Sequence, residues 1–324
     1  MKTIPDITCI GEVLIDFIST KKGVTLSDVP GFVKCAGGAA ANVAVGLAKL
    51  GILSAFVGKV GNDPFGKFLH RQLREEGVDV SGLRTTQDYN TRLAFVSLSK
   101  SSERDFKFWE QHPADEQLQL SDVNPDRLRK SKIVHISSFL LLNEPARSTA
   151  LRIARRLKQK RCDISFDPNL RLSLWKSHME ARKIHSEMVR SSTILKLNEE
   201  EALFLTNQRK LGEAIERLFS LGPSVVVVTM GREGCYVRTK HGSTFVKAIR
   251  VKTVDTTGCG DGFLAGLLSG IVNTNLQIYD ISLESWYSIC RTANAVGAIV
   301  ATRRGVFDAL PTSRELRHFL LTQS

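Results

Sequence analysis

The stretch VDTTGCGDGF at residues 254–263 places three glycines around a single aspartate, just where a helix is predicted to begin. We expect a strand before it, at 244–254. Glycines at such a junction allow a sharp turn and expose consecutive N–H groups, which together with the positive end of a helix dipole form an anion site. Asp261 would be the one carboxylate in that site, where it could take a proton from an attacking hydroxyl during phosphoryl transfer. The alternative is a tight turn in which Asp261 only caps the helix.

A second glycine-rich stretch, VKCAGGAAANVAVGLAKLG at 33–51, opens an alanine-rich helix with Asn42 on its first turns. Small side chains let a ligand approach the backbone closely, and the Asn42 amide offers both a donor and an acceptor. Close helix–helix packing would also explain this segment by itself. The two stretches together are more specific for a ligand site than either one alone.

Strands and helices alternate along the rest of the chain, which predicts a mostly parallel sheet with helices on both faces. The apolar run VVVV at 225–228 fits a strand buried on both sides. Strands are expected at 7–18, 54–61, 132–138, 163–167, 193–197 and 224–230. Helices are expected at 38–51, 63–78, 145–160, 177–190, 198–205, 209–220, 258–272 and 282–300, with a hairpin-rich segment at 234–253. We expect one main domain over residues 1–324, with segments near 12–35 and 90–112 forming a small accessory sheet.

The charge balance is basic, with 45 Lys and Arg against 33 Asp and Glu and a net charge of +12. Basic residues cluster at 127–132 and 152–161. In the second cluster Leu151, Ala154 and Leu157 recur at helical spacing, which is typical of an amphipathic helix with a solvated basic face. A nucleic-acid or membrane-surface patch is the alternative, but no aromatic residue is interleaved for base stacking. A general attraction of anionic substrates is a third use, so we expect neither a nucleic acid nor a membrane as partner.

The six cysteines lie at 9, 35, 162, 235, 259 and 290 and form no CxxC pair, so reduced thiols are expected. No apolar run approaches the roughly 20 residues needed to cross a bilayer. The chain enters a strand pattern without a targeting segment, and a cytoplasmic location is therefore expected.

The two glycine-rich stretches resemble the two signatures of the ribokinase-type (PfkB) carbohydrate kinases, and the resemblance covers essentially the whole chain. The motifs GEVLIDF, GKVGNDPFGKFL, FDPNLRLSLW, LKLNEEE, VVTMGREGCYV and ANAVGAIVATRRG occur in the family's order. FVKCAGGAAANVAVGLAKLG, FDPNLRLSLW and LAFVSL are most similar to the fructokinase branch. The resemblance implies a ribokinase-like α/β fold whose accessory sheet is a lid. It also implies ATP, Mg²⁺ and K⁺ as ligands, and a homodimer formed through the lid.

The resemblance further implies roles for individual residues. Those expected to bind the sugar are Asp16, Gly37, Gly38 and Asn42. The expected catalytic base is Asp261, and its anion hole would be formed by Gly258, Cys259 and Gly260. Residues expected around the nucleotide are Asn198, Thr229, Gly231, Gly234 and Asn294. Glu201 would help to place Mg²⁺ through waters, and Asp255 with Thr257 would form part of a monovalent-cation site. Two of these have simpler alternatives, since Asp16 could be a turn residue at a strand end and Asn198 an ordinary helix N-cap.

Some residues depart from the family pattern. The usual GAGDAF reads GCGDGF, so Cys259 replaces an alanine in an anion hole that works through backbone N–H groups. Gly262 costs about 1 kcal/mol of helix propensity relative to alanine and would loosen the base. Asn90 and Glu110 stand where lid arginines are usual, and Arg92 is displaced by two positions. If they face the sugar, Glu110 would repel a carboxylate substrate, whereas Arg92 could turn inward and pair with one.

The sequence therefore predicts an ATP-dependent sugar kinase that phosphorylates a primary hydroxyl, with fructose as the expected substrate. One alternative is a relative that acts on another sugar or sugar acid such as 2-keto-3-deoxygluconate. An alternative of another class is a non-catalytic scaffold similar to the fructokinase-like proteins of plastid transcription complexes.

Overall fold

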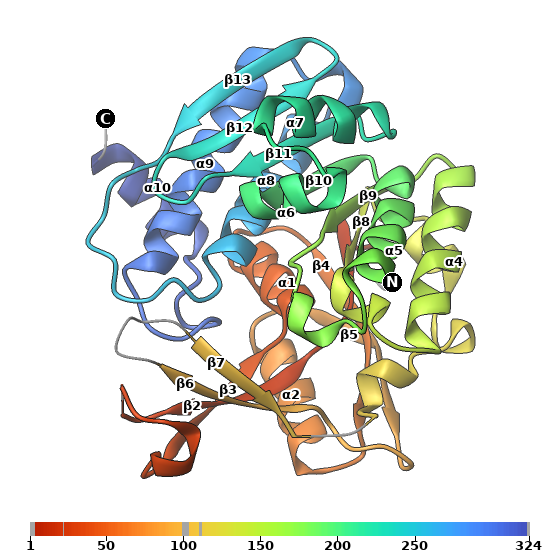
Figure 1. Ribbon diagram of the computed structural model, residues 1–324, viewed down its shortest axis with the longest axis vertical. Helices are drawn as coiled ribbons and strands as arrows, with labels where there is room; N and C mark the ends of the chain where they lie inside the picture. Colours follow the sequence, from red (N-terminus) through yellow and green to blue (C-terminus); the bar gives the residue numbers. More distant parts are fainter. Residues whose placement is uncertain (1–3, 22, 99–103, 110–111, 323–324) are drawn as a thin grey trace.

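The larger of two sheets runs through the middle of the protein in the computed structural model, which describes residues 4–21, 23–98, 104–109 and 112–322 (Figure 1). Within these residues it has nine strands in the order β13-β12-β11-β10-β9-β8-β1-β4-β5. The strands are β1 (Ile7–Ile10), β4 (Ser54–Gly61), β5 (Asp79–Thr86), β8 (Ile133–Ser137), β9 (Asp163–Asp167), β10 (Ile194–Asn198), β11 (Val225–Thr229), β12 (Gly234–Thr239) and β13 (Gly242–Lys247). All neighbouring pairs are parallel except β11–β12 and β12–β13.

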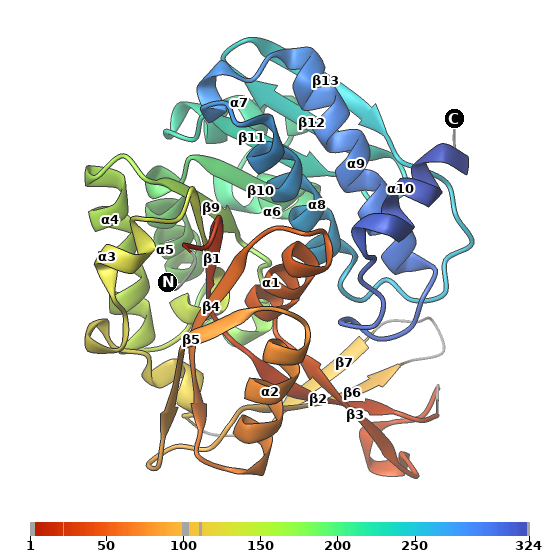
Figure 2. The same ribbon diagram turned by 180° about the vertical axis from the view of Figure 1, so that it is seen from behind.

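Helices cover both faces of this sheet, as Figures 1 and 2 show from opposite sides. One face carries α1 (Ala39–Lys49), α2 (Pro64–Glu75), α8 (Cys259–Thr274), α9 (Leu283–Ala301) and α10 (Ser313–Thr322). The other carries α4 (Ala146–Gln159), α5 (His178–Ser191), α6 (Glu199–Thr206) and α7 (Leu211–Ser220), and the short α3 (Pro125–Leu128) precedes β8. Helix α2 begins as expected, because Asp63 accepts the Gly66 N–H as N-cap and Pro64 follows it.

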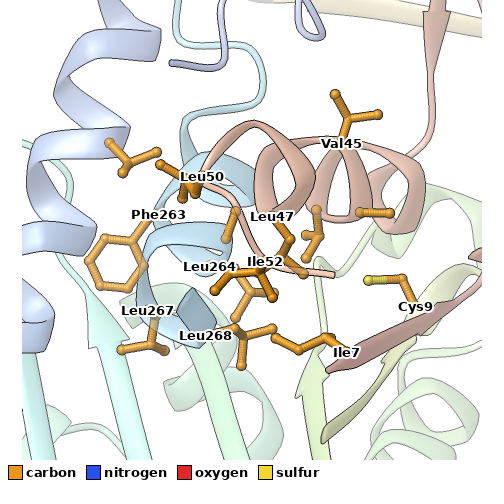
Figure 3. Packing of buried hydrophobic residues seen from close by; sticks show 14 of the residues in the cluster. Ile7, Cys9, Val45, Leu47, Leu50, Ile52, Phe263, Leu264, Leu267 and Leu268 are labelled. Carbon is orange, nitrogen blue, oxygen red and sulfur yellow. The ribbon is translucent and has the colours of Figure 1, made fainter. Parts of the chain in front are cut away.

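Successive side chains of β11 point to opposite faces of the sheet, and both faces are buried, which explains why its sequence is uniformly apolar. Val225 and Val227 belong to the core beneath α1 and α8, whereas Val226 and Val228 belong to the core beneath α4 to α7. All four are completely buried, as expected for a strand enclosed on both faces. Figure 3 shows part of the first core, where Leu264 and Leu268 of α8 and Leu47 of α1 pack above Ile7.

A second, smaller sheet lies beside the first, at the bottom of Figure 1, and forms the lid. Its described strands are β2 (Leu14–Ser19), β3 (Phe32–Gly37), β6 (Leu93–Leu98) and β7 (Arg104–Phe108), in the order β3-β2-β6-β7. Aromatic rings join the strands, since Phe17 stacks on Phe95 at 5.1 Å between ring centroids and Phe32 meets Phe95 edge-on at 5.2 Å. The mostly parallel sheet, the flanking helices and this lid confirm the predicted fold class.

Two strand predictions were wrong in part. The segment 7–18 is not one strand but two, because the chain leaves the large sheet after Ile10 and enters the lid at Leu14. Gly11 lies at this break, where a Cβ atom would come within 2.4 Å of the Ala40 side chain. The strand expected at 244–254 ends at Lys247, and residues 248–257 form an irregular loop. Strand β5 and helix α10 were not anticipated. Among the described residues, no helix is both long and apolar enough to cross a bilayer.

Candidate active site

The two glycine-rich stretches meet at the carboxyl edge of the large sheet, where the amino ends of α1 and α8 face each other. A cavity of about 790 Å³ lies there. The predicted site residues that line it are Asp16, Gly38, Asn42, Asn198, Glu201, Thr229, Thr257, Gly258, Gly260 and Asp261. In open parallel sheets this edge is the usual place for ligands.

Asp261 lies in the first turn of α8 and is held by α1. Its Oδ2 atom accepts a hydrogen bond of 2.7 Å from the Asn42 amide, across 219 residues of sequence. The Asp261 side chain is only 9% exposed, and burial raises its pKa to about 6, against the lowering effect of the Asn42 bond. The carboxylate is thus ionised at neutral pH yet close to the pKa range that suits a general base.

The backbone before Asp261 has the shape of an anion site. Gly258 adopts a left-handed φ of 72° as N-cap of α8, and a Cβ atom there would come within 2.7 Å of Val306. Gly262 donates its N–H to the Gly258 carbonyl at 2.7 Å, which closes the first turn. The Cys259 thiol lies 3.9 Å from the Asp255 carbonyl oxygen, and Cys259 lines the neighbouring cavity rather than this one. Its side chain therefore leaves the anion site to the main chain.

Sequence reasoning missed a buried ion pair at the same place. Lys196 of β10 donates to Asp167 Oδ2 of β9 at 2.7 Å, and both side chains are 7% exposed. The Lys196 ammonium group lies only 3.2 Å from the position that a Cβ atom of Gly260 would take. The fixed positive charge thus stands directly beside the glycine turn. The signal was present, because both residues lie near the ends of adjacent parallel strands in the motifs FDPNLR and LKLN.

The side of the cavity that is predicted to bind the sugar is built around β2 and the start of α1. Asp16 lies so close to Gly37 that a Cβ atom there would come within 2.2 Å of the Asp16 Oδ2 atom. Gly38 has a φ of 107° and accepts the Asn42 N–H at 2.8 Å, so it sets the direction in which α1 begins. Glu12 also lines this side, which sequence reasoning did not anticipate.

A second cavity, of about 730 Å³, adjoins the first and shares Thr229 and Gly260 with it. The predicted nucleotide residues Gly231, Gly234 and Asn294 line it. The Asn294 amide donates to the carbonyls of Val246 and Lys247, both at 3.1 Å, and so ties α9 to the end of β13.

The predicted metal residues are held mainly by main-chain groups. Asn198 and Glu201 form a capping box on α6, and the second Glu201 oxygen accepts the Leu170 N–H at 2.7 Å. Asp255 Oδ1 accepts from the Thr257 N–H at 3.0 Å and from its hydroxyl at 2.6 Å. Within the described part of the chain, no group of three or more His, Cys, Asp or Glu side chains is arranged to hold a metal ion.

Arg92 does not take the inward orientation that would let it pair with a substrate carboxylate. Its guanidinium pairs with Asp115 at 3.0 Å and with Glu116 at 2.6 Å, and its side chain is 5% exposed. Glu110 lies outside the described residues, and Asn90 is exposed. Arg92 therefore anchors the base of the lid, next to β6, and is not available to a substrate carboxylate.

Comparison with known proteins places this geometry among sugar kinases. The model of the pfkB family carbohydrate kinases matches residues 5–313. "Probable fructokinase-6, chloroplastic" of Arabidopsis thaliana is 41% identical over 98% of this chain and 83% of its own length. The fructokinase of Xylella fastidiosa with bound ATP superposes with a TM-score of 0.89 at 30% identity, covering 98% of both chains. A double-mutant fructokinase of Vibrio cholerae O395 with fructose, ADP and potassium bound has a TM-score of 0.86 at 32% identity, covering 99% of both chains.

Proposed function

This chain belongs to the pfkB family of carbohydrate kinases, and we propose that it transfers the γ-phosphate of ATP to a primary hydroxyl of fructose. Its fold is ribokinase-like. The observation that carries the proposal is the Asn42–Asp261 hydrogen bond, because it joins the two signature stretches at one carboxylate beside a glycine turn. The same contact argues against the non-catalytic scaffold, which would not require a poised base.

The sugar binds between Asp16 and Asn42, with its reacting hydroxyl at Asp261. The Asp261 carboxylate accepts the hydroxyl proton as the sugar oxygen attacks the γ-phosphorus of ATP and ADP leaves. The N–H groups at the start of α8 and the Lys196 ammonium group face the negative charge that gathers on the moving phosphoryl group. Asp167 keeps Lys196 at this position through their buried ion pair. Lys196 is therefore a proposed phosphate ligand in addition to the predicted residues.

The oxygen-rich donors of the cavity fit Mg²⁺, which prefers oxygen ligands and keeps several waters. Both Glu201 oxygens already accept main-chain N–H groups, so Glu201 and Asn198 would reach the ion through water. When bound with ATP, Mg²⁺ neutralises charge on the phosphates. Thr229, Gly231, Gly234 and Asn294 are the proposed nucleotide contacts in the adjoining cavity.

Asp255 and Thr257 are proposed as part of a K⁺ site, because they lie in the loop that leads into the glycine turn. A cation there would steady the anion hole, so K⁺ should raise turnover by comparison with a large organic cation at equal ionic strength. Titrating the two chloride salts tests this directly. Equal rates throughout the titration would remove K⁺ from the proposal.

Fructose is proposed as the substrate on two grounds. Asp16 supplies an acceptor for neutral hydroxyls, and Arg92 is unavailable to a sugar acid because it is paired with Asp115 and Glu116. An ADP-release assay over fructose, ribose, adenosine and 2-keto-3-deoxygluconate is the test. We expect the highest kcat/KM with fructose. A tenfold advantage of the sugar acid, about 1.4 kcal/mol in transition-state preference, would assign the chain to the alternative substrate.

A homodimer formed through the lid and a cytoplasmic location are also proposed. The lid presents exposed apolar side chains, and all six cysteines are reduced thiols in the structure. One relative carries "chloroplastic" in its name, so the compartment is best tested by imaging a tagged chain.

A further inference from the structure

The motif GEVLIDF contributes a second acidic residue to the cavity besides Asp16. Glu12 lies between β1 and β2, is 2% exposed and lines the sugar side of the cavity. Its Oε1 atom accepts the Ala39 N–H at 2.6 Å. Its Oε2 atom is buried and has no hydrogen-bond partner among the described residues. An ionised carboxylate with one unpaired oxygen is costly to bury, so the environment favours the neutral acid.

The Glu12–Ala39 bond stands at the start of a chain of contacts that ends at the base. Ala39 is the first residue of α1, and its N–H has no partner within the helix. The N-cap residue Gly38 has no side chain that could accept a hydrogen bond from this N–H. Glu12 therefore does the work of a cap from outside the helix. The next links are the Asn42 N–H on the Gly38 carbonyl, at 2.8 Å, and the Asn42 amide on Asp261, at 2.7 Å.

The groups around Glu12 agree with a protonated side chain. Burial raises the pKa of Glu12 to about 7, and Asp115 contributes in the same direction. Asp115 belongs to the 3₁₀ helix η2 (Ala114–Gln117), where Arg92 pairs with Asp115 and Glu116 rather than with Glu12. The Ser137 hydroxyl of β8 and the main chain of Glu12 and Ala39 lower the pKa of Glu12 less than burial raises it. Ser137 lies near Glu12 but does not complete a hydrogen bond to Oε2 within normal geometry, so Oε2 stays without a partner.

We propose that Glu12 is a positioning residue for phosphoryl transfer, which acts as a neutral acid through Ala39 and Asn42 on the orientation of Asp261. The inference rests on the proposed kinase activity. The Ala39 N–H favours the ionised form, but this offsets the effect of burial only in part. Ionisation would therefore leave a poorly solvated charge beside Asp115, which the side chain would relieve by turning toward the cavity and away from Ala39. The start of α1 would then loosen, and Asn42 would hold Asp261 less well.

The test is the pH dependence of kcat with saturating fructose and MgATP in the wild type and in Glu12→Gln and Glu12→Ala. The wild-type rate should rise through about pH 6 as Asp261 loses its proton, and fall above about pH 7 as Glu12 loses its own. Glutamine mimics the neutral acid, so Glu12→Gln should keep kcat within about threefold at neutral pH and lose the alkaline fall. Glu12→Ala should lower kcat about tenfold or more at every pH.

Glu116→Gln is the matched control, because it changes a buried carboxyl of the neighbouring network that does not touch Ala39. It should retain the alkaline fall. An alkaline fall that is unchanged in Glu12→Gln, or a Glu12→Gln enzyme as slow as Glu12→Ala, would overturn the proposal.

Thermal unfolding separates this inference from the proposed activity. The pKa of Glu12 is higher in the folded than in the unfolded chain, so its contribution to stability is complete below about pH 4.5 and is lost as the pH rises through about 7. Glu12→Gln has no such proton to lose, and its Tm relative to the wild type should increase from about pH 5 to about pH 8. A Tm difference that does not change with pH would contradict the neutral acid, whatever sugar the enzyme uses.

Discussion

At the scale of single residues, the site depends on one carboxylate whose surroundings pull its proton affinity in opposite directions. Burial and Asp167 raise the pKa of Asp261, whereas Asn42, Lys196 and Arg171 lower it. The balance keeps Asp261 ionised at neutral pH but still basic enough to accept a proton. Removal of the charge should therefore affect turnover more than binding.

Asp261→Asn keeps the shape of the side chain and removes its capacity to accept a proton. We expect kcat to fall by about 10²–10⁴-fold or more, with fructose binding largely retained. Turnover in the coupled assay and fructose affinity by calorimetry measure the two effects separately. Near-normal turnover of the purified variant would mean that Asp261 is not the base.

At the scale of elements, α8, which carries the proposed base Asp261, packs closely against α9. Gly262 and Gly266 lie on the side of α8 that faces α9. A Cβ atom at 262 would come within 2.9 Å of Val300, and one at 266 within 2.9 Å of the Ala293 Cα. Gly262 thus permits close packing of α8 on α9. This role could not be inferred from the low helix propensity of glycine.

Gly266→Ala should lower the free energy of unfolding by about 1–3 kcal/mol, because main-chain atoms of α9 cannot turn aside from the added methyl group. The midpoint of urea unfolding measures this. Gly212→Ala in α7 is the matched control, since nothing lies within 4 Å of its Cβ position. That change should raise stability by about 0.5–1 kcal/mol. If the two substitutions have equal effects, close packing of α8 on α9 is not what requires Gly266.

The sequence predicted those elements whose information is local. The starts of α2 and α8 and the uniformly apolar β11 could be read from a few adjacent residues. The break at Gly11 could not, because the close contact that requires a glycine there comes from Ala40 of another element. Strand β5 was missed because DVSGLRTT lies at the sheet edge and is largely polar.

The same limit applies to the site. Asp261 and Asn42 belong to recognisable motifs. The place of Lys196 in the site could not be predicted, because it depends on the ion pair with Asp167, 29 residues away. The orientation of Arg92 stayed open for a similar reason, since its partners Asp115 and Glu116 come from a segment that carried no signal for burial. Charges at strand ends become interpretable once the strand order is known.

At the scale of the whole molecule, the lid leaves apolar side chains at the surface. Val33 on β3 is 54% exposed and Trp109, just after β7, is 69% exposed. We therefore expect a dimer in sedimentation, and Val33→Glu should shift it toward the monomer. Met179→Glu on α5 is the control, because Met179 is 79% exposed but lies outside the lid. A wild-type protein that sediments as a monomer at all concentrations would refute assembly through the lid.

The lid is discontinuous in sequence, and this restricts how it can be exchanged for the lid of a related protein. Its strands come from two stretches, 14–37 and 93–108, and the intervening stretch supplies α1, β4, α2 and β5 of the main body. The lid cannot be removed as one continuous segment of the chain, and it cannot be replaced by inserting one continuous segment. A chimera that borrows a relative's lid would need four junctions, and one of them would lie between Gly37 and Gly38, inside the proposed sugar site. Such a kinase would acquire new specificity more readily by point substitutions than by recombination of modules.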